Sequence, residues 1–136
     1  MKAYCTQRFI DEFFKLSKKK QYKDLESLIL GFFLDNSFSV VATGDRLYGP
    51  NEIPFLKKRL PNSGGYRIYF LADFSKEIVY INYVHPKTGP DGSDNITNAF
   101  KKELHTTILN DRNNLESLFE IEKCSEYKTI LFSEIK

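Results

Sequence analysis

Four cations gather on two adjoining segments of the chain, in the stretch KKRLPNSGGYRIYF (Lys57–Phe70). Lys57, Lys58 and Arg59 precede a Pro-Asn-Ser-Gly-Gly turn, and Arg67 follows shortly after it. Arginine presents a planar fork of hydrogen-bond donors and lysine a compact positive charge, and both bind phosphate oxygens. The stretch therefore predicts a phosphate site, with a solvated sheet face carrying scattered charge as the alternative.

The glycine-rich turn predicts that the two segments are neighbouring antiparallel strands. Because successive side chains of a strand point to opposite faces, Lys57 and Arg59 share one face of the first strand. Arg67 and Tyr69 share a face of the second strand, and burying the apolar faces brings the two basic faces together. Tyr69 is then placed to stack on a base beside the phosphate. Alternation points Lys58 toward the buried face, from which a bulge or an edge position would release it.

The spacing of apolar residues predicts the elements that carry these strands. Apolar residues recur every three to four positions over residues 6–19 and 25–34, which predicts two adjacent helices, an αα-hairpin. Strands follow at residues 55–60, 66–72 and 77–84, and the short gaps between them predict antiparallel neighbours. The pattern predicts an α+β fold: a small antiparallel β-sheet with the N-terminal αα-hairpin packed on one face.

The C-terminal part of the chain is harder to interpret from its periodicity. A third helix is expected near residues 95–108. Beyond it, LESLFEIEKC fits a helix, while YKTILFSEI fits either a helix or a strand. We therefore expect one domain over residues 1–110 and a C-terminal extension, residues 111–136, packed on or beside it.

The charge of the chain is uneven although its net value is only +2. Residues 1–110 carry 16 Lys and Arg against 12 Asp and Glu, a balance of +4, whereas residues 111–136 carry 4 against 6, a balance of −2. The two cysteines, Cys5 and Cys124, form no CxxC pair, which favours free thiols in a reducing compartment. The N-terminus has no apolar signal segment, and the longest apolar run is far shorter than the ~20 residues of a membrane span. We expect a cytoplasmic protein with no membrane partner.

Three stretches in this order resemble the RelE/ParE superfamily, the toxins of type II toxin–antitoxin systems: TQRFIDEFFKLSKK, LKKRLPNSGGYRIYFLAD and IVYINYVHPKTG. The likeness covers about residues 3–90, and GGYRIYF looks closest to the HigB/RelE-like branch of mRNA interferases. The resemblance implies a RelE-like fold and an endoribonuclease that cleaves messenger RNA, usually on the ribosome, and that a cognate antitoxin inhibits. It also implies that no metal and no other cofactor is used, because the RNA 2′-hydroxyl itself attacks the adjacent phosphate.

The resemblance also implies roles for individual residues. Arg67 matches the arginine that holds the scissile phosphate, and Arg59 and Lys57 match the two basic positions of the preceding strand. One of these two neutralises the phosphate or acts as the base, a role that lysine fills more readily. His85 lies near a further basic position and is a candidate general acid, because its pKa is near neutrality; a loop histidine of no function is the alternative. The remaining candidates, expected to contact the substrate, are Lys58, Tyr69 and Lys87.

Two other functions stay open at this stage. A ParE-like member of the superfamily would inhibit a protein target without chemistry, and an inactive member would only bind RNA or an antitoxin. The three cations on one sheet face favour the ribonuclease, because a protein that only binds does not need such a cluster. The chain departs from the family pattern by extending well past the usual end of the fold.

Overall fold

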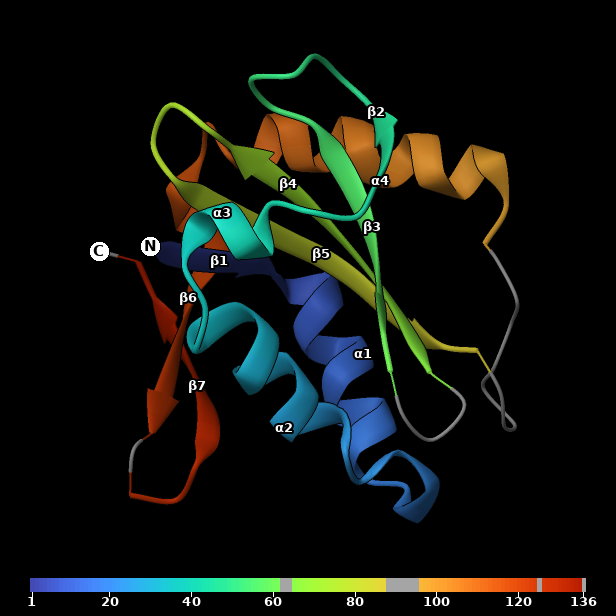
Figure 1. The fold of residues 1–136 in the computed structure, drawn as a ribbon, viewed down its shortest axis with the longest axis vertical. Helices are drawn as coiled ribbons and strands as arrows, with labels where there is room; N and C mark the ends of the chain where they lie inside the picture. The colour runs from blue at the N-terminus through green and yellow to red at the C-terminus, as the bar shows by residue number, and fades with distance from the viewer. Residues whose placement is uncertain (62–64, 88–95, 125, 136) are drawn as a thin grey trace.

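A computed structural model describes residues 1–61, 65–87, 96–124 and 126–135 of the chain (Figure 1). In chain order the elements are β1 (Lys2–Thr6), α1 (Gln7–Ser17), the 3₁₀ turn η1 (Lys20–Tyr22), α2 (Leu25–Ile29), the π-helical turn η2 (Leu30–Leu34), α3 (Phe38–Val41), β2 (Asp45–Tyr48), β3 (Phe55–Leu60), β4 (Tyr66–Asp73), β5 (Ile78–Pro86), α4 (Asn98–Asp111), the 3₁₀ turn η3 (Leu115–Ser117), β6 (Leu118–Cys124) and β7 (Thr129–Glu134). None of the described helices is both long and apolar enough to cross a membrane.

The strands of the described residues form a single seven-stranded sheet in the order β2-β3-β4-β5-β1-β6-β7. Neighbouring strands are antiparallel except for β1 and β5, which run parallel. β1 therefore lies inside the sheet, between β5 and β6, although it begins the chain. Strands β4 and β5 are covered on both faces, which explains why almost all of their residues are buried.

Helices cover the sheet from both sides and create two separate cores (Figure 1). The first core places α1, α2 and η2 against one face, where Phe9, Phe13 and Phe33 pack on residues such as Phe70. Helix α1 begins where the sequence predicts, because the hydroxyl of Thr6 accepts a hydrogen bond from the Phe9 amide at 3.2 Å. The second core places Leu104 and Ile108 of α4 against the opposite face.

The predicted fold class is wrong. The protein has a mixed α/β fold with a seven-stranded sheet, whereas the prediction was a small antiparallel sheet covered on one face by an N-terminal αα-hairpin. The antiparallel unit β3-β4-β5 does lie where three strands were expected. Short loops reveal such neighbours, but they say nothing about the parallel pairing of β1 with β5, which joins segments some 70 residues apart in the chain.

The C-terminal residues extend this sheet. Strand β6, for which a helix was expected, pairs with β1, and β7 pairs with β6 and forms the edge. Ile121 and Ile130 of these strands are buried in the first core. The amide of Ile130 donates to the carboxylate of Glu26 on α2 at 3.0 Å, so part of the exposed edge is covered by a charged side chain.

Candidate functional site

The register of β3, β4 and β5 brings the predicted basic residues together. Arg59 lies directly opposite Arg67, which in turn lies opposite His85 on β5. Lys57 lies opposite Tyr69 in the next row on the same face. Lys57, Arg59, Arg67 and Tyr69 therefore share one face, as predicted. This face is not open as expected, because α4 packs over part of it and Tyr69 is fully buried.

A further cation comes from α4, which packs over this face of the sheet. Lys101 is only 7% exposed, and its charge acts on both Lys57 and His85. We call Lys57, Arg59, Arg67 and Lys101 the cation cluster. Lys101 was not among the predicted site residues. Its spacing with the apolar positions Leu104 and Ile108 nevertheless places it on the buried stripe of the helix.

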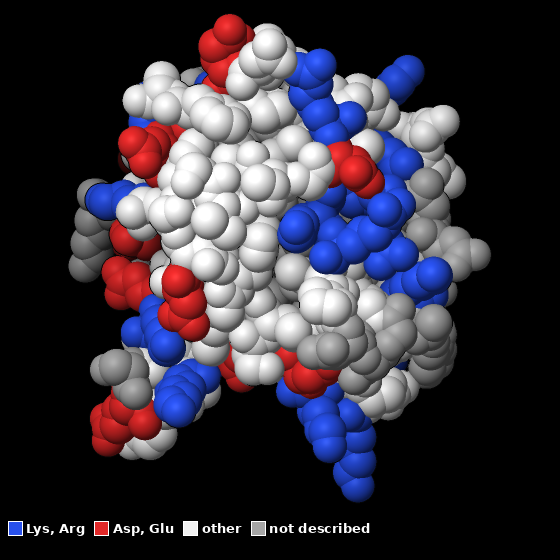
Figure 2. All heavy atoms as spheres, in the orientation of Figure 1, with Lys and Arg blue, Asp and Glu red and all other residues white. Residues whose placement is uncertain are grey.

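Among the described residues, the neighbours of the cation cluster neutralise only part of its positive charge. Like charges directly opposite each other on paired strands repel, as Arg59 and Arg67 do here. Asp45 of β2 lies 3.7 Å from Arg59, and both side chains of this pair are more than half exposed, so the pair is screened by water. Figure 2 looks onto the side of the sheet that carries α1 and α2 and shows further Lys and Arg side chains right of centre, where Figure 1 places β2 and β3, whereas the cation cluster lies on the side of α4. This surplus of positive charge suits an anionic ligand.

The environment of Lys57 makes its ammonium group easier to deprotonate than that of an ordinary lysine. Burial lowers the pKa of Lys57, and the positive charges of Arg59, Lys101 and Arg67 lower it further. The carboxylate of Asp45 acts in the opposite direction. An amine with a lowered pKa is able to accept a proton nearer neutral pH, which is the property required of a general base.

Tyr69 and His85 form a buried pair beside the cluster. Their hydroxyl and Nε2 atoms lie 3.0 Å apart, and the two rings stack with centroids 5.7 Å apart. The Nδ1 atom of His85 lies 3.1 Å from the carbonyl oxygen of Pro86. A carbonyl oxygen only accepts, so Nδ1 carries the proton of the neutral ring and the Tyr69 hydroxyl donates to Nε2. Burial raises the pKa of Tyr69 to about 12 and lowers the pKa of His85, so both are neutral at pH 7.

The lowered pKa of His85 predicts that the protein loses stability in mild acid. The folded protein binds this proton more weakly than the unfolded chain does, so stability is lost as the pH falls from about 6.5 toward the lowered folded-state value. Replacing His85 by glutamine, which can still accept from Tyr69, is expected to reduce this loss. Urea denaturation at about pH 7.5 and pH 5.5 measures it.

The same experiment on His105→Gln provides a comparison, because burial also lowers the pKa of that histidine. A combined variant should then lose most of the acid sensitivity between these pH values. If the unfolding free energy of His85→Gln fell between the two pH values by as much as that of the wild type, the assignment of a neutral, buried His85 would be contradicted.

The three residues predicted to contact the substrate are placed less favourably for binding RNA than the residues of the cation cluster. The ammonium group of Lys58 lies on the opposite face, 5.2 Å from the ring centroid of Phe32. Tyr69 is 0% exposed, which leaves its ring no free face for a base. Lys87 is exposed just beyond β5, where its amide donates to the carbonyl oxygen of Gly65 at 3.0 Å. Of the three, only Lys87 presents its charge to solvent near the β3–β4 turn.

The sequence was compared with protein-family models and with curated proteins, and neither comparison found a match. The likeness to the RelE/ParE superfamily therefore stays an expectation that rests on the three short stretches quoted above, which include α1, β3, β4 and β5. The positions of the cation cluster and of the Tyr69–His85 pair are independent of that likeness.

Proposed function

We propose that the cation cluster binds a phosphodiester group of RNA and cleaves it without a metal ion. The observation that carries this proposal is the direct opposition of Arg59 and Arg67, with Lys57 and the buried Lys101 beside them. A bound phosphate offsets the repulsion among these charges and accepts hydrogen bonds from both guanidinium groups. RNA carries its own nucleophile, the 2′-hydroxyl, next to each phosphate.

The proposed reaction uses Lys57 as the general base. Its neutral amine removes the proton of the 2′-hydroxyl, which attacks the adjacent phosphorus and forms a cyclic phosphate. Arg59 and Arg67 stabilise the negative charge that develops on the phosphate oxygens. The 5′-oxygen leaves and takes its proton from water. His85, expected from the sequence to supply this proton, is neutral at pH 7 and instead holds Tyr69 in place against the cluster.

This mechanism predicts how the rate depends on pH. Cleavage should accelerate with rising pH until Lys57 is fully deprotonated, and Lys57→Gln should abolish that rise. Arg59→Gln removes the positive charge that lowers the Lys57 pKa most, so it should move the profile to higher pH. Initial rates on a short RNA between about pH 6 and pH 10 test both expectations. If the pH–rate profile of Arg59→Gln coincided with that of the wild type, Lys57 would be excluded as the base.

We further propose, from the likeness to the RelE/ParE superfamily, that the substrate is messenger RNA, that cleavage takes place on the ribosome and that a cognate antitoxin covers the cluster. The test is growth after induced expression of the wild type and of Arg67→Gln, with primer extension on a reporter messenger RNA. Growth arrest with new cleavage ends, both lost in the variant, would support the toxin. Well-expressed wild type that neither arrests growth nor cuts the messenger would contradict it.

A second candidate function is RNA binding without cleavage. The burial of both members of the Tyr69–His85 pair favours it, since His85 is only 4% exposed and Tyr69 is fully covered. In this case the cluster would still bind RNA phosphate, and Arg67→Gln would weaken binding. Gel analysis of a labelled RNA after long incubation separates the two functions, because only the ribonuclease yields shorter products with a cyclic phosphate end.

A further inference from the structure

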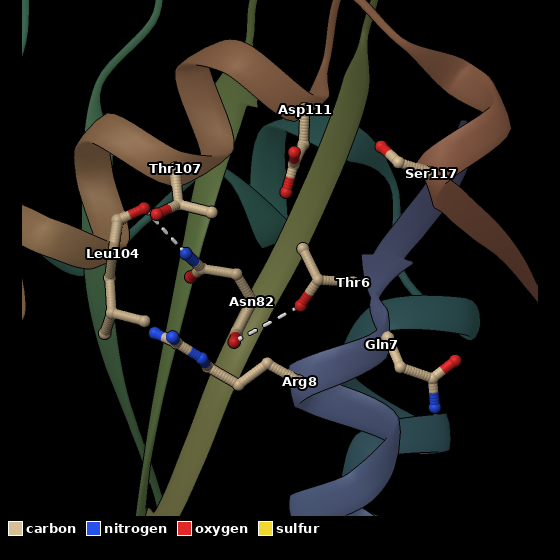
Figure 3. A pocket seen from close by; sticks show the side chains of 8 residues that line it. All are labelled: Thr6, Gln7, Arg8, Asn82, Leu104, Thr107, Asp111 and Ser117. Atoms are coloured by element: carbon tan, nitrogen blue, oxygen red, sulfur yellow. Dashed lines mark hydrogen bonds between the residues drawn. The ribbon is translucent and has the colours of Figure 1, made fainter.

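A cavity of about 240 Å³ lies away from the cation cluster, between α1, β5, α4 and η3 (Figure 3). The N-terminal residues of α1 form one wall, and the C-terminal half of α4 forms another. The side chains that matter for its chemistry are Thr6, Arg8, Asn82, Thr107, Asp111 and Ser117.

Asn82 contributes a buried acceptor to the cavity wall. Its side chain is 1% exposed, and its amide nitrogen donates to the carbonyl oxygen of Leu104 at 2.8 Å. Among the described residues, its Oδ1 atom has no hydrogen-bond partner. Buried side-chain oxygens in folded proteins are nearly always paired, so an unpaired one points to a donor that none of the described residues supplies.

Asp111 contributes a carboxylate to the same cavity. Within the described part of the chain, this carboxylate makes no hydrogen bond and no ion pair. The guanidinium of Arg8 attracts it only from a distance, since Arg8 pairs with Glu103 at 3.7 Å and lies over the ring of Phe100. Burial raises the pKa of Asp111, and the positive charge of Arg8 offsets only part of this rise.

Hydroxyl groups complete an acceptor-rich surface. The Ser117 hydroxyl donates to the carbonyl oxygen of Asn114 at 2.7 Å, so its oxygen remains able to accept. Figure 3 shows Asp111 pointing into the cavity from α4, the Ser117 hydroxyl turned toward the same space from η3, and Thr107 beside Asn82. The cavity thus combines one charged acceptor, one unpaired amide oxygen and hydroxyl oxygens within a small volume.

We infer that this cavity binds a protonated primary amine. The ammonium group has three donors, which match the Asp111 carboxylate, the Asn82 Oδ1 atom and the hydroxyl of Ser117 or Thr107. The ligand is either a simple amine or the amino group of an amino acid. In the second case the carboxylate of the ligand lies toward Arg8 at the other end of the cavity. This site is independent of the function proposed for the cation cluster.

Calorimetric titration of the full chain with methylammonium, putrescine and glycine tests the inference. At least one of these amines should bind the wild type, and Asp111→Asn should weaken that binding about tenfold or more, because it removes a charged hydrogen bond. Ser117→Ala should weaken it less. The matched control is Glu122→Gln, which removes an exposed carboxylate of β6 outside the cavity lining and should leave binding unchanged.

Comparing the three amines distinguishes a simple amine from an amino acid as the ligand. Tighter binding of glycine than of methylammonium, with the difference lost in Arg8→Gln, would identify an amino acid, whereas the reverse order would identify a simple amine. Thermal unfolding of each variant without ligand verifies that it folds. Absence of binding by the wild type, or equal affinity in Asp111→Asn and Glu122→Gln, would overturn the inference.

Discussion

Replacing Arg67 by glutamine is expected to slow RNA cleavage by about 100-fold or more, because a preorganised donor to the developing phosphate charge is lost. Arg67 lies between Arg59 and His85 in the sheet register, so it occupies the middle of the site. Single-turnover cleavage of a short labelled RNA measures the effect. Thermal unfolding of the variant shows whether the protein remains folded.

Lys58→Gln is the matched control for Arg67→Gln. Lys58 also lies on one of the two central basic strands, but its charge lies on the opposite face of the sheet, over Phe32. The control variant should cleave within about twofold of the wild type, since distant exposed charges are screened by salt. Equal losses in both variants would mean that general positive charge, and not the cation cluster, attracts the RNA.

Replacing Ile121 by alanine is expected to destabilise the protein by about 2–5 kcal/mol, the usual cost of truncating a buried aliphatic side chain. Ile121 is 3% exposed and packs in the core beneath α1 and α2, although it belongs to the C-terminal strand β6. Such a loss is a large part of the total stability of a domain of this size. Urea denaturation followed by circular dichroism measures it.

Leu131→Ala on the neighbouring strand β7 is the control. Leu131 is 46% exposed, and its replacement should change the unfolding free energy by no more than about 0.5 kcal/mol. If Ile121→Ala were as harmless as Leu131→Ala, strand β6 would not be part of the core. The result would then contradict the seven-stranded sheet.

Local patterns in the sequence were sufficient to predict the part of the fold that carries the site. The period of the apolar residues predicted α1, whose first turn is capped by Thr6. The glycine turn and the alternation predicted β3 and β4, and therefore the common face of Lys57 and Arg67. These features depend on residues near each other in the chain, where spacing and turn chemistry act directly.

The elements that were not predicted depend on contacts between distant segments. Pairing of β1 with β5 and with β6 joins the first residues of the chain to its middle and its end, and no short-range pattern encodes such pairing. LESLFEIEKC has apolar residues compatible with a helical period, yet its last seven residues form β6 because β1 offers an open edge. Lys101 was missed because a lysine on an apolar helix face usually reaches solvent, whereas here α4 packs on the sheet.

The most direct test of the cation cluster is the salt dependence of RNA binding. A 2′-O-methyl oligonucleotide cannot be cleaved by the proposed reaction, so its affinity can be measured at equilibrium over a range of salt concentrations. Each cation that contacts a phosphate of a single strand contributes about 0.7 to the slope of log affinity against log salt. Removing Lys57, Arg59 and Arg67 together should lower the slope by about 2, while Lys58→Gln should leave it unchanged. An unchanged slope in the triple variant would show that RNA does not bind at this face.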